Sequence, residues 1–349
     1  MTSRNSTRQI IVQIAATLLG YFGAILISRM DYEMICRQWK IAAGICVFLI
    51  ILTFIVGVGR QDDLRNDDKA WLMIFGITFQ PSELAKIGFI ITFSYHLSKL
   101  LNAGILNEPL SIIYLCLHGA APVLLVHLQG DDGSALVFLF VFIVMMFAAG
   151  VKMRYFIAAS GLLVVAAPIM WFKVMDEFQK KRILILFNPE LDPELTAFQQ
   201  LRAATAIGSG RLYGQGLFNG TYTQNGMVPE DHNDFIFSVA SEELGFLGAV
   251  AVIILLLAIM VRIFIIARRS RDDMGELLCM GFFAIIAFQS IANIGMCLGI
   301  APVIGITLPF FSAGGSSAAC LYLGLGLVLS VSMQSSHKYS NDRIGYAYK

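Results

Sequence analysis

Four short stretches of the sequence place ionisable or small polar residues where long apolar runs begin or end. Charged groups in such places are costly, so they mark functional sites by default. The first stretch, residues 80–86, carries Gln80, Pro81, Glu83 and Lys86. Proline suits the first turn of a helix, and residues three apart share a helix face. Glu83 and Lys86 are therefore expected on one helix face, and we predict that they bind substrate while Gln80 and Pro81 shape the cavity. Alternatively, Glu83 complements the helix dipole and Lys86 reaches the membrane interface.

The second and third stretches supply carboxylates. Asp131 and Asp132 are adjacent in a short loop, residues 129–134, which is otherwise interpreted as a hydrated turn with a helix cap. Asp234 is the last charge before a long apolar helix, and Glu242 and Glu243 lie about 12 Å deeper along that helix. Carboxylates at that depth are expected to face protein or a polar cavity. The alternative makes Asp234 a helix cap and both glutamates structural partners.

The fourth stretch, residues 308–317, combines glycines with hydroxyl groups before the last apolar run. Such a turn brings backbone N–H groups to an anion such as pyrophosphate. The predicted binding residues are Ser312, Gly314, Gly315 and Ser316. The alternative is a re-entrant turn that lets helices pack closely.

The elements that position these residues are membrane-spanning helices. Of the 349 residues, 57% are hydrophobic and 14% are charged, against roughly 25% charged in soluble domains. Net charge is +1, so no basic field predicts a nucleic-acid partner. The six cysteines form no C-x-x-C pair and are interpreted as buried apolar residues. We predict an all-α, polytopic membrane protein whose nine spans cover residues 10–28, 41–58, 82–98, 109–128, 134–150, 153–172, 235–266, 275–298 and 316–334.

Two connecting segments stand out. Residues 173–234 form a large loop with one predicted helix, Glu194–Ile207, capped by Asp192 and Pro193. Residues 299–315 are apolar but broken by glycines and prolines, and such backbone is tolerated at membrane depth only where protein or a cavity covers it. Lysines and arginines mark the cytoplasmic loops. This orientation places the large loop and all four stretches on the outer face, where a lipid-linked substrate with a polar, anionic head would fit.

The stretches also resemble, in order, the motifs of the SEDS family (shape, elongation, division and sporulation), from about residue 8 to residue 334. The matching motifs are Q-P-S-E-L-A-K at 80–86, F-Q-K-K-R-I-L at 178–184, N-P-E-L-D-P at 188–193, A-I-G-S-G at 206–210, D-F-I-F at 234–237, E-E-L-G at 242–245 and L-P-F-F-S-A-G-G-S-S at 308–317.

The resemblance implies a single domain over residues 1–349 with the family's ten-helix fold. The family's first helix has no counterpart here, since Arg8–Ile27 aligns with its second, so nine spans and an outer N-terminus are expected. The family polymerises lipid II into peptidoglycan strands at the outer face of the bacterial cytoplasmic membrane, for cell shape or division. Its essential aspartate falls on Asp234, and its cavity lysine and aspartate fall on Lys86 and Asp131.

The resemblance also implies a class B penicillin-binding protein as partner, beside lipid II and membrane lipids. No ligand spacing fixes a metal, and a divalent cation, Mg²⁺ or Mn²⁺, stays open as a helper of Lys86. Two other functions stay open: a lipid II flippase or other transporter, and an inactive scaffold for the penicillin-binding protein.

Overall fold

The computed structural model describes residues 7–59, 69–74, 76–188, 196–230 and 232–347. The chain divides into two compact units. One comprises residues 150–255 and 289–312, and the other comprises residues 6–149, 256–288 and 313–349. Two long helices, α11 (Ile236–Arg268) and α12 (Asp273–Cys297), pass from one unit into the other. We describe each unit by itself.

Nine long helices in the described ranges coincide with the nine predicted spans. Besides α11 and α12 they are α1 (Thr7–Arg29), α3 (Trp39–Val56), α4 (Pro81–Asn102), α5 (Pro109–His127), α6 (Asp132–Ala148), α7 (Met153–Ile169) and α13 (Gly315–Ala347). Seven of the nine are long and apolar enough to cross a bilayer by themselves. The other two are α6, with 17 residues, and α4, which carries Glu83 and Lys86. The predicted all-α, polytopic membrane fold is confirmed.

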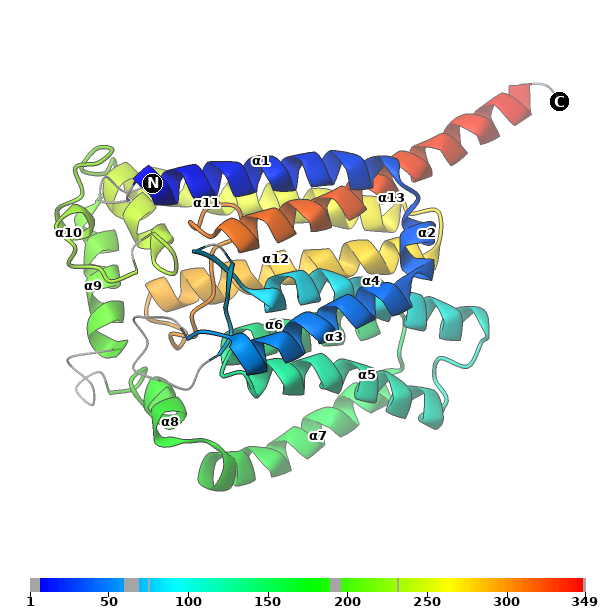
Figure 1. Ribbon diagram of the computed structural model, residues 1–349, viewed down its shortest axis with the longest axis horizontal. Coiled ribbons are helices and arrows are strands. Elements are labelled where there is room, and N and C mark those ends of the chain that lie inside the picture. The colour runs from blue at the N-terminus through cyan, green and yellow to red at the C-terminus, as the bar shows by residue number, and fades with distance from the viewer. Residues whose placement is uncertain (1–6, 60–68, 75, 189–195, 231, 348–349) are drawn as a thin grey trace. The chain divides into compact units, whose positions relative to one another are not determined.

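In the larger unit, α1 runs alongside α13 (Figure 1). The two backbones approach closely because each helix has a glycine facing the backbone of the other helix. A Cβ at Gly20 would lie 2.8 Å from the Cα of Ala319, and one at Gly326 would lie 2.8 Å from the Cα of Ala24. Small residues at such contacts let membrane helices pack by van der Waals contact.

The same unit contains a small hairpin that the all-α prediction misses. β1 (Leu72–Ile74) pairs antiparallel with β2 (Ile77–Phe79), with Leu72 opposite Phe79. Gly76 has a φ of 74°, which a tight hairpin turn requires. A run of apolar and β-branched residues around a glycine was the sequence signal. The hairpin leads directly into Gln80 and the start of α4.

The smaller unit holds the large loop and the broken segment. The loop contains α8 (Glu177–Leu184), α9 (Thr196–Ser209) and α10 (Thr221–Gln224). The predicted helix corresponds to α9, which continues to Ser209, while its predicted cap, Asp192–Pro193, lies outside the described residues. The prediction missed α8, although Asp176 and Gln179 form a capping box at its start. Residues 299–314 contain no helix, as their glycines and prolines predict.

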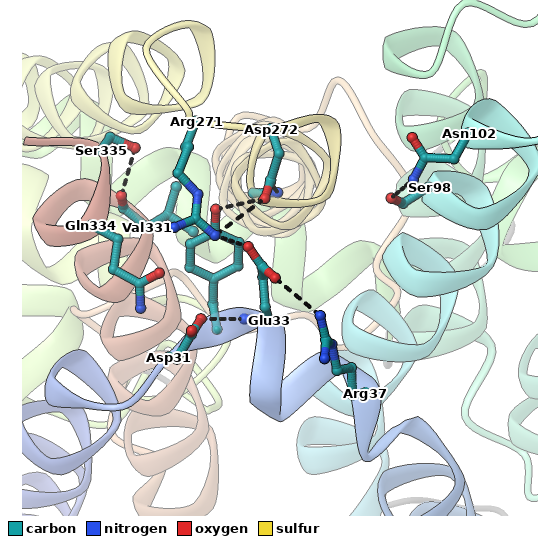
Figure 2. Close-up of polar contacts among 12 residues, drawn as sticks. Asp31, Glu33, Arg37, Ser98, Asn102, Arg271, Asp272, Val331, Gln334 and Ser335 are labelled. Atoms are coloured by element: carbon teal, nitrogen blue, oxygen red, sulfur yellow. Dashed lines mark hydrogen bonds and ion pairs between the residues drawn. The ribbon is translucent and has the colours of Figure 1, made fainter. Parts of the chain in front are cut away.

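A polar network joins short α2 (Tyr32–Arg37) to the α11–α12 connection in the larger unit (Figure 2). Arg271 pairs with Glu33, which also lies 3.5 Å from Arg37. The buried Tyr32 hydroxyl donates to Asp272 at 3.0 Å. α2 lies outside the spans, so the network fastens two connecting segments to one another.

Tyr32 gives this network a pH signature. Burial and then the Asp272 carboxylate raise the pKa of the Tyr32 hydroxyl. The contribution of Tyr32 to the free energy of unfolding is therefore complete below the pKa of about 10 that tyrosine has in the unfolded chain. This contribution declines as the pH rises toward the higher pKa of the folded state. We expect Tyr32→Phe to cost about 1–2 kcal/mol of unfolding free energy at neutral pH, and the gap to the wild type to narrow above pH 10. Thermal unfolding in detergent at both pH values measures this, and a gap that stays constant would contradict it.

Candidate active site

Asp234 lies in a buried turn immediately before α11 and is 5% exposed. Helix α11 begins at Ile236, so Phe235, not Asp234, precedes the helix directly. The alternative interpretation of Asp234 as a helix cap stays open, because Asp234 lies within two residues of the helix start. The Asp234 carbonyl accepts a hydrogen bond from Asn293 Nδ2 at 2.8 Å. Because Asn293 Nδ2 also donates to the Ile306 carbonyl at 2.7 Å, this one amide ties the turn to the broken segment.

The broken segment contacts the same turn at two further points. Ser312 Oγ donates to the Asn233 carbonyl at 2.6 Å and accepts from the Leu308 N–H at 2.7 Å. Gly305, with a φ of 66°, lies beside the carboxylate, since a Cβ there would stand 3.8 Å from Asp234 Oδ2. Two predicted residues, Asp234 and Ser312, are thus brought to one place in this unit.

Sequence reasoning missed Asn293 and Gly305. Asn293 is completely buried on α12. An amide inside an apolar span was the available signal, because such a group requires partners in the membrane. Its hydrogen bonds to two segments, however, depend on tertiary structure that spacing does not reveal.

Helix α11 is broken at Gly245, where the prediction had one continuous helix. Gly245 has a φ of 70°, and a side chain there would collide with the backbone of Gly214. At the break, N–H and carbonyl groups of α11 lack partners within the helix and form hydrogen bonds with the backbone of the large loop. The Gln215 N–H donates to the Glu242 carbonyl at 3.0 Å, and the Phe246 N–H donates to the Arg211 carbonyl at 2.8 Å. The loop thus completes the hydrogen bonding of the broken helix.

Glu242 and Glu243 fasten this loop with their side chains. Glu242 is fully buried and accepts hydrogen bonds from the N–H groups of Tyr222 and Thr223, at 2.8 and 2.9 Å, and from Ser209 Oγ at 3.0 Å. Glu243 accepts from Gln224 Nε2 at 2.6 Å. Both carboxylates face protein, and their partners belong to the loop, not to the Asp234 turn.

We expect Glu242→Ala to loosen this loop strongly. The substitution removes the acceptor of three donors, and each buried donor left without one costs about 1–3 kcal/mol. Glu242→Gln keeps one acceptor oxygen and should have an intermediate effect. Limited proteolysis between Ser209 and Gln224, together with the melting temperature, measures both variants. Glu177→Ala removes a 92% exposed carboxylate of the same unit and serves as the control. Cleavage as slow as in the control would contradict this role.

In the larger unit, Glu83 and Lys86 do face one another, as their spacing predicts. Lys86 Nζ lies 2.8 Å from Glu83 Oε1, and the side chains are 2% and 7% exposed. Both side chains are buried in protein, which argues against the alternative that Lys86 extends to the membrane interface. Pro81 occupies the first turn of α4, as predicted. A buried pair without solvent interacts strongly with any further charge brought beside it.

Asp131 joins the starts of α4 and α6. Its Oδ2 accepts from Gln80 Nε2 at 2.7 Å and from Ser82 Oγ at 3.1 Å, and its Oδ1 accepts from the Ser134 N–H at 2.9 Å. Asp132 instead contacts His127 at 2.6 Å. The two adjacent carboxylates therefore have separate partners, and Asp131 alone belongs with Gln80 and Ser82.

Gly315 begins α13, and a Cβ there would lie 3.2 Å from the Cβ of Ala16 on α1. This close packing agrees with the packing alternative for the fourth stretch. Anion binding by Gly314, Gly315 and Ser316 stays a prediction. The convergence of Asp234 and Lys86 on one face of the membrane also stays a prediction, because the two residues belong to separate units.

Comparisons with known proteins agree with the motifs. A family profile described as "Cell cycle protein" and named for FtsW, RodA and SpoVE matches residues 1–337. The probable peptidoglycan glycosyltransferase FtsW of Geobacter metallireducens is 35% identical over 321 residues, covering 90% of this chain and 82% of the relative. The peptidoglycan glycosyltransferase MrdB of Escherichia coli is 32% identical over 286 residues, covering 82% of this chain and 76% of MrdB.

Two solved structures share the fold. A chain from "Structural coordination of polymerization and crosslinking by a peptidoglycan synthase complex" has a TM-score of 0.80 at 28% identity, covering 95% of this chain and 91% of that chain. The rod shape determining protein RodA of Thermus thermophilus has a TM-score of 0.67 at 27% identity, covering 95% of this chain and 89% of that chain. Because the family profile matches residues 1–337, from before α1 into α13, the chain belongs to the FtsW/RodA/SpoVE family, the SEDS proteins whose motifs its sequence carries.

Proposed function

We propose that this protein is a peptidoglycan glycosyltransferase that joins lipid II units into glycan strands at the outer face of the cytoplasmic membrane. Its relatives are named as peptidoglycan glycosyltransferases. The observation that carries the chemistry is Asp234, a buried carboxylate in a turn that Asn293 and Ser312 hold in place. Fixed orientation of this kind is what a general base needs.

In the proposed reaction, Asp234 removes the proton from the 4-hydroxyl of the acceptor sugar. The hydroxyl oxygen attacks the anomeric carbon of the donor and forms the new glycosidic bond with inversion. The bond from that carbon to undecaprenyl pyrophosphate breaks, and the leaving group takes the electron pair. Lys86 offsets the charge that develops on the pyrophosphate, and Glu83 and Asp131 position the lysine and its helix.

No residue of the proposed site is assigned to a metal ion. Within the described ranges, no three His, Cys, Asp or Glu side chains gather in a group that could hold one. Glu83 and Asp131 are engaged by Lys86 and by Ser82. A requirement for Mg²⁺ or Mn²⁺ stays a prediction, to be measured as the effect of EDTA on polymerisation.

A crosslinking class B penicillin-binding protein is the proposed partner. The synthase complex that resembles this chain is described as coordinating polymerization and crosslinking. Seven apolar helices are each able to cross a bilayer, so the protein is expected to lie in the membrane. A membrane-bound partner and lipid II would contact it there.

In the deciding experiment, the purified protein is incubated with labelled lipid II, with and without the partner. We expect glycan strands and released undecaprenyl pyrophosphate. Movement of lipid II across a vesicle membrane without polymer would favour the transporter. Binding of the partner with neither activity would favour the scaffold. Either result would overturn the polymerase.

A further inference from the structure

A groove in the smaller unit plays no part in the proposed reaction. It has a volume of about 990 Å³ and lies at the C-terminal end of α9, where the large loop turns toward α10. Pockets for small molecules commonly have about 300–1,000 Å³. The groove is lined by Thr205, Gly208, Ser209, Gly210, Arg211, Leu212, Tyr213, Gly214, Gln215 and Tyr222.

Hydrogen bonds hold the lining in one arrangement. Gln215 Nε2 donates to Ser209 Oγ at 2.9 Å, and Gln215 Oε1 accepts from Thr221 Oγ1 at 2.7 Å. Ser209 Oγ also contacts the buried carboxylate of Glu242, which in turn holds the N–H of Tyr222. A lining that is already ordered loses little entropy when a ligand binds.

The charges around the groove argue against an anionic ligand. The C-terminal end of α9 carries the negative end of the helix dipole, and its last carbonyl oxygens accept hydrogen bonds from the N–H groups of Gly210 and Arg211 and from the Gln215 side chain. The Glu242 carboxylate lies directly behind the lining residues Ser209 and Tyr222. Arg211 is the cation among the lining residues, and it is exposed to solvent. Pyrophosphate would therefore meet more negative than positive charge here.

A neutral ligand rich in hydroxyl and amide groups fits better. Each backbone carbonyl oxygen at the end of α9 has a second lone pair that can accept a hydrogen bond from a sugar hydroxyl. Tyr213, which is 77% exposed, and Tyr222 add aromatic rings that bury an apolar face and still offer a hydroxyl.

We propose that this groove binds the glycan strand, a chain of N-acetylated sugars, as it leaves the active site. This inference rests on the proposed function and names a second subsite for its product. A strand held by the groove dissociates less often between additions, so the groove sets how long the polymer grows.

The test separates binding from synthesis. The full-length protein is titrated with the soluble tetramer of N-acetylglucosamine, which carries neither lipid nor phosphate. We expect the wild type to bind it and Tyr213→Ala to bind about fivefold more weakly, as expected for one lost aromatic contact. In the lipid II assay the same variant should keep the initial rate but make shorter strands. Phe187→Ala removes an aromatic residue that is 84% exposed in the same unit and does not line the groove, so it is the matched control.

Three results would overturn the groove assignment. They are no tetramer binding by the wild type, equal weakening in Tyr213→Ala and Phe187→Ala, and displacement of the tetramer by pyrophosphate. Should Tyr213→Ala unfold, Tyr222→Leu provides the same measurement from α10. Failure of the proposed function would look different, because the wild type would bind the tetramer yet make no polymer from lipid II.

Discussion

Asp234→Asn is expected to lower the rate of lipid II polymerisation by about 10²- to 10⁴-fold, the usual contribution of a positioned base. Asparagine has nearly the same shape but cannot take the acceptor proton. The hydrogen bonds from Asn293 and Ser312 reach backbone carbonyls of the turn, so they survive the substitution. Lipid II binding and the melting temperature should therefore change little. Single-turnover polymerisation, with binding measured separately, tests this.

The matched control for this prediction is Asp273→Asn. Asp273 is an exposed carboxylate in the first turn of α12, and its loss should leave the polymerisation rate close to that of the wild type. If Asp234→Asn polymerised as fast as the control, Asp234 would not be the base.

The second large effect concerns the buried pair on α4. Lys86→Met leaves the Glu83 carboxylate buried without its cation, and breaking such a pair typically costs about 3–5 kcal/mol. The double variant Glu83→Gln/Lys86→Met removes both charges, so most of that stability should return. We therefore expect a large drop in melting temperature for Lys86→Met and a small one for the double variant.

The double variant also separates folding from chemistry. If Lys86 offsets charge on the leaving pyrophosphate, the folded double variant should still lose about 10²-fold in polymerisation rate. A folded double variant with full activity would exclude this role. Arg268→Met is the control for stability, because Arg268 pairs with Glu276 while 65% exposed; such a loss costs about 0–1 kcal/mol.

The spans and the Glu83–Lys86 pair could be predicted because both depend on spacing along the chain. A run of about 20 apolar residues is sufficient to predict a span. Two residues that are three positions apart on a helix lie next to each other regardless of the surrounding structure. The broken character of residues 299–314 was predictable for a similar reason, since Gly299, Pro302 and Gly305 oppose a helix by themselves.

The rest of the site depends on tertiary contacts. Nothing in the spacing indicates that Asn293 reaches both Asp234 and Ile306. The break at Gly245 was missed because a glycine inside an apolar helix is usually tolerated. It becomes a break here because the loop backbone at Leu212 and Gly214 occupies the space beside it.

The pairing of the loop with the broken α11 constrains the number of residues in the loop. Backbone groups of Arg211, Gln215 and Gly216 meet Phe246, Glu242 and Glu243 one for one. A single inserted or deleted residue between Arg211 and Gln215 would shift the partners of Gln215 and Gly216 relative to the partner of Arg211. Homologues should therefore keep the number of residues here constant and keep glycine at positions 210, 214 and 245, where a side chain would collide with backbone.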